Sequence, residues 1–401
     1  MTQLLIEGQW QVAGRFERKC RKWARVQHQT TQRAALLVVG GEQRRPRGVQ
    51  ELGDHWYGYG AGVILGVDVD LGTDLDVDVE NDGRSAERAP RVAVERHLRY
   101  VSPADVCGPE DPILFKSSTY RDGRLYACTQ TEVLVLEVPG FAVLHHLSLP
   151  CFNDVHHVVP TAAGTLLVAN SGLEMVLEVT LDGEVVAVHN VLGEDPWAAF
   201  PPDRDYRIGV DLKPHRAHPN HVLLLGDEPF ATRFELRDAV SLHDPARVVA
   251  IERERAHDGV VHDGRLWFTT VDGHLVVADA STLEVVEDVS LAAHHGPDAV
   301  LGWCRGLLVE DEHVWVGFSR IRATRFRQTL SWVRTGTTRF CPTRIARYRR
   351  ADWTCDLEVD LEPHGLNAVF SIIDLASETA AAPGAPGAPG APDAPDARWA
   401  A

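Results

Sequence analysis

The alternation of hydrophobic and polar positions is clearest from residue 91 onward in this 401-residue chain. The segment RVAVERHLRY at 91–100 alternates apolar and polar residues, as a β-strand with one buried face does. Short apolar segments bounded by Gly, Asp, Asn and Pro then follow to about residue 375, with little sign of helical periodicity. Regularly spaced short strands with turn signals predict an all-β fold, which is a sandwich, a barrel or a propeller.

Internal repetition decides among these three folds. The clearest unit, residues 257–268, has an apolar strand, an Asp-Gly turn and a second apolar strand. Similar units occur elsewhere, with weaker copies at 115–126 and 363–370; the stronger ones are 155–168, 219–225 and 304–316. Several units continue with two more strands, so that four strands occupy about 40 residues, which is the pattern of a propeller blade.

We therefore predict a β-propeller over residues 91–375, with six blades. Residues 1–90 are predicted to be an irregular, partly disordered N-terminal extension, and 376–401 a disordered tail of Pro, Gly and Ala. The sixth blade is expected to close by pairing of the C-terminal strand with the strand at 91–100. Five blades is the alternative, because the sixth lacks obvious middle strands unless residues 35–80 supply them.

Composition narrows the class of protein. The formal net charge of −17 argues against a nucleic-acid or anionic-membrane partner, since phosphate binding requires a basic surface. None of the seven Cys forms a CxxC pair, which favours reduced thiols over a disulfide framework or a structural zinc site. No signal peptide and no apolar stretch of about 20 residues is apparent. These features predict a cytoplasmic protein that acts on a small molecule.

The candidate site lies at the channel mouth. In a propeller the first strand of each blade lines the channel, so residues at equivalent strand starts face one funnel. These positions are polar in all six repeats: Ser117, His156, Asn220, Asp258, Arg305 and His364. Further histidines lie next to them: His157, His218, His221 and His257.

Imidazoles from different blades can together hold a divalent metal and leave a position open for water or substrate. We predict four metal ligands, with iron, zinc, copper and calcium not distinguished: His156, His221, His257 and His364. We predict that catalysis uses His157, His257, Asp258, Arg305, His218 and Asn220. In this hypothesis Asp258 orients a histidine, and Arg305 binds an anionic group of the substrate.

The order of motifs also resembles a known family. The segments His156-His157, His218-Pro219-Asn220 and His257-Asp258, with Arg233 or Arg237 between the last two, are similar in order to those of bacterial arylsulfotransferases. That resemblance implies that His257 carries sulfate covalently, helped by His157, His218 and Arg233. The segment at 169–176 also resembles blades of lactonase, strictosidine-synthase and NHL-type propellers, some of which bind calcium or zinc in the channel.

Three functions follow as hypotheses. The leading one is a small-molecule enzyme with a metal at the channel mouth that activates substrate, water or dioxygen. The second is metal-free group transfer through His257. The third is a propeller that serves as a binding scaffold without catalysis.

Overall fold

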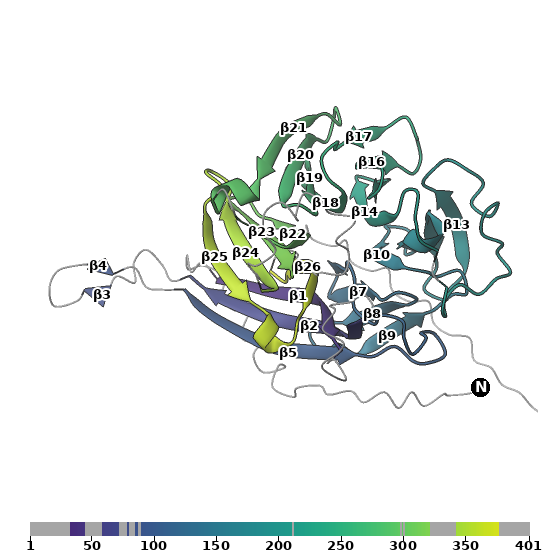
Figure 1. The fold of residues 1–401 in the computed structure, drawn as a ribbon, viewed down its shortest axis with the longest axis horizontal. Helices are drawn as coiled ribbons and strands as arrows, with labels where there is room; N and C mark the ends of the chain where they lie inside the picture. The colour runs from purple at the N-terminus through teal and green to yellow at the C-terminus, as the bar shows by residue number, and fades with distance from the viewer. Residues whose placement is uncertain are drawn as a thin grey trace, which may run out of the picture.

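The computed structural model describes residues 33–44, 58–71, 78–79, 85–86, 90–210, 212–296, 299, 301–320 and 342–376. Six four-stranded antiparallel sheets surround a central axis, which confirms the six-bladed propeller (Figure 1). A separate short pair, β3 (Asp78–Val79) and β4 (Ser85–Ala86), projects from the ring. The Arg-rich segment 321–341 and residues 377–401 lie outside the described residues, so the prediction of a disordered tail is not tested.

Each blade is named here from its innermost strand outward. Blade 1 contains β26 (Ala368–Asp374), β1 (Arg33–Gln43), β2 (Tyr59–Asp70) and β5 (Arg91–Tyr100). Blade 2 contains β6 (Thr119–Arg121), β7 (Arg124–Cys128), β8 (Val133–Glu137) and β9 (Val143–Leu147). Blade 3 contains β10 (Val155–Pro160), β11 (Leu166–Asn170), β12 (Met175–Val179) and β13 (Val185–Asn190).

The remaining blades follow the chain in the same way. Blade 4 contains β14 (Pro219–Leu225), β15 (Glu228–Arg233), β16 (Asp238–Ser241) and β17 (Val248–Ala250). Blade 5 contains β18 (Ala256–His262), β19 (Arg265–Thr270), β20 (His274–Asp279) and β21 (Val285–Ser290). Blade 6 contains β22 (Trp303–Val309), β23 (His313–Ser319), β24 (Arg344–Arg349) and β25 (Cys355–Asp360).

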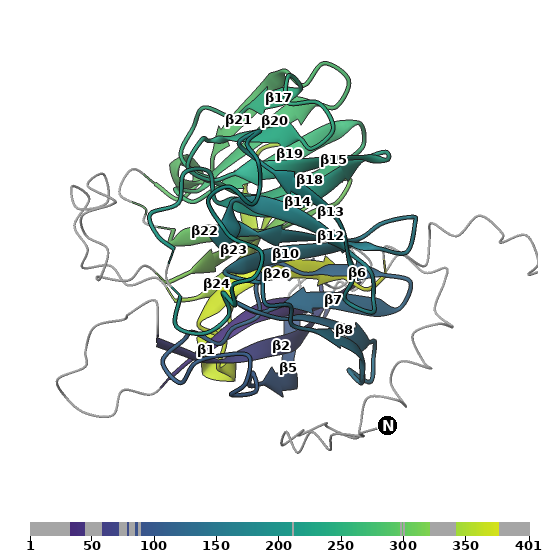
Figure 2. The same ribbon diagram turned by 90° about the vertical axis from the view of Figure 1, so that its right-hand side faces the viewer.

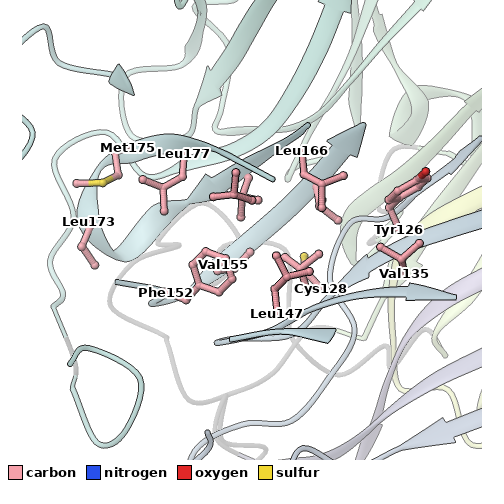
Figure 3. Close-up of a cluster of buried hydrophobic side chains, with 14 of the residues drawn as sticks. Tyr126, Cys128, Val135, Leu147, Phe152, Val155, Leu166, Leu173, Met175 and Leu177 are labelled. Atoms are coloured by element: carbon pink, nitrogen blue, oxygen red, sulfur yellow. The ribbon is translucent and has the colours of Figure 1, made fainter. Parts of the chain in front are cut away.

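The core lies between the blades. Apolar side chains of blade 2, such as Val135 and Leu147, face those of blade 3, such as Val155 and Leu177 (Figure 3). The middle strands of blade 3, β11 and β12, therefore bury both faces and carry nearly continuous apolar runs, while its outer strand β13 is exposed or half-buried along its length. This packing holds neighbouring inner strands at fixed positions around the channel.

The N-terminal boundary of the propeller differs from the prediction. Residues 33–43 and 59–70, assigned to an irregular extension, form the two middle strands β1 and β2 of blade 1, which was the alternative considered for residues 35–80. The C-terminal strand β26 pairs with β1, and β5 pairs with β2, so the predicted pairing of the C-terminal strand with 91–100 is wrong. The cause is burial: β1 and β2 are apolar on both faces in their central part and lack the alternation that marks a strand with one exposed face.

The ring closes within blade 1. Both views place β26, from the C-terminal end of the described chain, beside β1, from its N-terminal end (Figure 1, Figure 2). Pairing of the two ends of the chain completes blade 1, which would otherwise lack its inner strand and expose an unpaired edge. Closure also brings residues near 370 to the channel beside residues near 117 and 305.

Candidate functional site

Five inner strands carry a β-bulge or irregularity near the same end. The register shifts fall between Val155 and His157, Pro219 and His221, Ala256 and Gly259, and Arg305 and Leu307, and opposite Val39 and Gly40 in β26. A bulge leaves an extra residue whose side chain is turned away from the regular alternation. The residues at these bulges are His156, Asn220, His257 with Asp258, Gly306, and Phe370.

The predicted register therefore holds in three of these strands, is off by one residue in blade 6 and fails in blade 1. Arg305 lies one residue before its bulge, and Ser117 in blade 2 donates its backbone N–H to the carbonyl of His156 at 3.0 Å. The equivalent of His156 in blade 1 is Phe370, whereas His364 lies in the 3-10 helix η5 (Glu362–His364). The carbonyl of His364 accepts a hydrogen bond from Arg96 of the outer strand β5. The short turn through η5 and Gly365, which the repeat pattern did not reveal, causes this shift of six positions.

Asp154 and Lys116 form a buried ion pair at this end of the channel. Lys116 is fully buried, and its Nζ lies 2.5 Å from Oδ1 of Asp154 and 3.3 Å from Nδ1 of His156. His156 Nδ1 also lies 2.8 Å from the carbonyl of Asp154 and 2.9 Å from the hydroxyl of Ser171, which in turn donates to the carbonyl of Pro219. These contacts set the orientation of the His156 ring.

Charges in this cluster set the protonation states. Burial alone would raise the pKa of Asp154, but the positive charge of the Lys116 ammonium holds it well below its usual range. Burial lowers the pKa of Lys116 and lowers those of His156 and His218 well below the usual value for imidazole. At neutral pH the site therefore presents an ionised carboxylate and two neutral imidazoles.

The backbone that carries Asp154 and His218 is unusual. Both residues directly precede an inner strand and adopt the left-handed conformation, with φ of 51° and 56°. Such φ values cost free energy in residues other than glycine and are maintained only by surrounding contacts. Glu174 supplies those contacts for His218, because its carboxylate accepts hydrogen bonds from the backbone N–H groups of Arg216, Ala217 and His218.

Asp154, His156 and His218 can together hold a metal ion. Their ligand atoms all lie within 4.8 Å of one another, and the His156 and His218 rings are 4.6 Å apart between centroids. Oδ2 of Asp154 is buried and has no hydrogen-bond partner among the described residues. A cavity of about 130 Å³ lies beside Asp154 and is also lined by Lys213 and His215.

A second histidine–carboxylate pair adjoins the first cluster. His257 Nδ1 lies 3.3 Å from Oδ1 of Asp258, and Oδ2 of Asp258 accepts hydrogen bonds from the Thr269 hydroxyl at 2.6 Å and the Gly306 N–H at 2.9 Å. Burial lowers the pKa of His257, although Asp258 opposes this effect. The His257 and His156 rings lie 6.3 Å apart between centroids, so the two clusters share one stretch of the channel.

His157 and His221 stack with their centroids 3.7 Å apart. His157 Nδ1 accepts from the Val222 N–H at 3.1 Å, so its Nε2 carries the proton and donates to Thr119 at 3.0 Å. Both nitrogens of His157 are thus engaged, which does not fit the catalytic role predicted for it. His221 Nδ1 lies 4.0 Å from Asp258, so this predicted metal ligand lies beside His257 and Asp258 and outside the group of Asp154, His156 and His218.

Arg305 and Asn220 complete the channel wall. Arg305 is buried, and its guanidinium lies over the rings of Phe370 at 4.6 Å and Trp303 at 5.0 Å. Burial lowers its pKa to about 10, which leaves it charged at neutral pH. Asn220 donates to the carbonyl of Ala256 at 3.4 Å, while its Oδ1 is buried without a partner among the described residues. Asn220 lies at the bulge of its strand, as predicted, and Arg305 lies one residue before the bulge of its strand.

Four residues of the site were not predicted from the sequence: Lys116, Asp154, Glu174 and Phe370. Lys116 and Asp154 had a usable signal, because each is a charged residue one or two positions before a predicted mouth position and close to an apolar segment. Glu174 acts on residues more than forty positions away, and Phe370 meets the channel only through ring closure. Neither has a local signal.

Comparisons with known proteins bear on the fold. No family model matches the chain, and a search of curated proteins finds no match. The structure resembles a protein of unknown function from Bacteroides caccae, with a TM-score of 0.50 and 11% identity over 84% of this chain and 98% of the other. It also matches the WD40 domain of Pan2 from Neurospora crassa, with a TM-score of 0.38 and 7% identity over 61% and 65% of the two chains.

The structure shows that the chain is a six-bladed β-propeller. At 11% sequence identity, the similarity to the Bacteroides caccae protein concerns the fold only. The resemblance to arylsulfotransferases and to lactonase-type propellers stays a hypothesis. Among the described residues no helix has the length and apolar character needed to cross a membrane.

Proposed function

We propose that this propeller is an enzyme that acts on a small, anionic molecule at the channel mouth with the help of a divalent metal. The observation that carries this proposal is the group of Asp154, His156 and His218, whose ligand atoms lie within 4.8 Å of one another beside a cavity. A buried carboxylate oxygen without a partner and two neutral imidazoles are the donors that such an ion requires.

The donor set indicates which metals fit. Two imidazoles and one carboxylate suit zinc and iron and are poor for calcium, which prefers oxygen ligands. Three protein ligands would leave open positions for substrate or water, and the bound ion would supply Lewis-acid activation. Lys116 would neutralise Asp154 through Oδ1, and Oδ2 would face the ion.

The neighbouring residues would handle protons and substrate charge. His257 is positioned as a general base or acid, because the Asp258 carboxylate keeps its ring in one orientation. Hydrogen bonds from Thr269 and Gly306 in turn fix the Asp258 carboxylate. Arg305 would bind an anionic group of the substrate.

Elemental analysis of the purified full-length chain tests the metal. We expect near-stoichiometric zinc or iron at this site, and a loss of at least tenfold in affinity in His156→Ala and His218→Ala. His145→Ala, a half-buried histidine on the outer strand β9, is the matched control and should bind as the parent does. Equal binding by the parent and both site variants, or no binding after reconstitution with zinc and iron, would overturn the proposal and favour a binding scaffold.

Group transfer through His257 without a metal is the second candidate. The specific observation is that the His257–Asp258 pair is complete without any contribution from Asp154. If this hypothesis is right, chelation leaves activity unchanged, and a labile adduct forms on His257 when the protein meets a donor of sulfuryl or phosphoryl groups. Such an adduct would be absent in His257→Ala and present in His218→Ala.

A further inference from the structure

A second group of metal-binding side chains lies outside the channel. His295 follows the 3-10 helix η3 (Leu291–His294), in the connection from blade 5 to blade 6. Cys355 and Glu358 lie on β25, the outer strand of blade 6. The ligand atoms of these three residues all lie within 4.8 Å of one another. The group therefore joins two parts of the chain that are about sixty residues apart and belong to different blade elements.

Each of the three side chains uses one atom in a contact with a neighbouring residue and has a second atom or a lone pair left to bind a metal ion. His295 Nε2 lies 2.7 Å from the hydroxyl of Tyr348, which leaves Nδ1 as the other ring nitrogen. A histidine that binds metal is commonly oriented by a hydrogen bond on its second nitrogen. Glu358 Oε1 accepts from Nε of Arg344 at 2.7 Å, which leaves Oε2.

Cys355 is half-buried against the core between blades 5 and 6, and its thiol lies 3.7 Å from the carbonyl of Leu357. Burial, with Glu358 nearby, raises the pKa of this thiol to about 11. A bound ion would take the thiolate, and the proton would leave to solvent as the sulfur–metal bond forms.

The geometry requires only a small contraction. Tetrahedral zinc at bond lengths of about 2.0–2.3 Å places its ligands roughly 3.5 Å apart. The present separations of up to 4.8 Å would shorten by about 1 Å through side-chain rotation. Glu358 is exposed, and His295 and Cys355 are only half-buried, so these rotations meet little resistance from packing.

We propose that His295, Cys355 and Glu358 form a second divalent-metal site, of the zinc class, which ties the connection between blades 5 and 6 to the outer strand of blade 6. One sulfur, one nitrogen and one oxygen donor suit zinc and exclude calcium and magnesium, which bind through oxygen. Water would complete the coordination. This site is independent of the channel site and would add to stability, because an ion that binds only the folded state favours that state.

Cobalt(II) titration of the full-length chain tests this site, because a cobalt–thiolate bond gives a near-ultraviolet charge-transfer band. Asp154, His156 and His218 contain no sulfur, so metal in the channel gives no such band. We expect the band in the parent and in His156→Ala, and its loss in Cys355→Ser. Cys151→Ser is the matched control, since Cys151 is also half-buried with a thiol pKa raised to about 11, and it should retain the band.

Glu358→Gln gives a second measurement in case Cys355→Ser folds poorly. Because Glu358 is exposed, this variant should fold, bind cobalt at least tenfold more weakly and lose most of the rise in melting temperature that zinc produces in the parent. Absence of the band in the parent, or its persistence in Cys355→Ser, would overturn the proposal. Loss of the band only in His156→Ala would also contradict it.

Discussion

At the scale of single residues, burial decides the chemical state of the histidines in the channel. His156 and His257 are buried and His218 is largely covered, and loss of hydration lowers the pKa of each, so the rings are neutral and can act as ligands or bases. Hydrogen bonds then separate their roles. His157 uses both nitrogens within the protein, whereas His257 is held by one carboxylate through Nδ1.

The burial of His221 predicts a loss of stability in acid. Burial lowers its pKa to about 4, against about 6.5 in an unfolded chain. Between pH 4 and pH 6.5 the unfolded state therefore binds more protons than the folded state. The contribution of His221 to the free energy of unfolding is complete above pH 6.5 and is lost as the pH falls toward 4. When the pH is lowered from 7 to 4.5, the free energy of unfolding should fall in both proteins, but by about 2 kcal/mol less in His221→Gln than in the parent.

Urea unfolding of metal-free protein at the two pH values measures this difference. His145→Gln on the outer strand β9 serves as the control. If His221→Gln and the parent lose the same unfolding free energy on acidification, His221 does not contribute to the acid sensitivity.

At the scale of elements, the close approach of β1 and β26 depends on one glycine. A Cβ at Gly40 would lie 1.7 Å from the carbonyl oxygen of Ala368, opposite the bulge that turns Phe370 toward the channel. The atom in the way is backbone, so it cannot move aside without displacing β26. The pairing of these strands, and with it the position of Phe370, requires glycine at this point.

Gly40→Ala should therefore destabilise the propeller by about 2–3 kcal/mol or more, as overpacking in a rigid core does. Gly140→Ala is the control, because a Cβ there would meet only the flexible Glu137 side chain at 3.6 Å. Thermal unfolding of the two variants gives the comparison. Equal melting temperatures would show that β1 and β26 are packed less closely than the structure indicates.

At the scale of the whole molecule, the ring holds the site together. Lys116 comes from the start of blade 2, Asp154 from blade 3, His218 from blade 4 and His257 from blade 5, while Phe370 arrives with the last strand. Each blade contributes one or two side chains, and the interblade cores keep them at fixed distances. The site exists only when the ring is closed.

Removal of β26 should therefore abolish the folded ring. A chain that stops at residue 367 lacks the inner strand of blade 1 and exposes the apolar residues of β1. We expect it to aggregate or to lose cooperative thermal unfolding. A chain that stops at residue 376 keeps every described strand and serves as the control. Cooperative unfolding of the shorter chain would contradict the role assigned to closure.

Much of the fold was predictable because the turns are local. Asp122-Gly123 and Asp263-Gly264 adopt the positive φ values of two-residue hairpin turns, as their sequences indicate. Three of the mouth positions were also predictable, because an apolar strand interrupted by a polar residue near its start marks the bulge. His364 was misplaced, since the turn through η5 has no counterpart in the other repeats.

The sequence by itself determined the strand–turn units, the propeller class and the polar side chains at most inner-strand starts, because these depend on contacts within about forty residues. Only the tertiary structure decided that residues 33–70 complete the first blade. Only the tertiary structure decided, too, that Lys116, Asp154, His156 and His218 form one cluster. The physical reason is distance along the chain: these contacts form when the ring closes, and no local pattern of hydrophobic and polar residues records them.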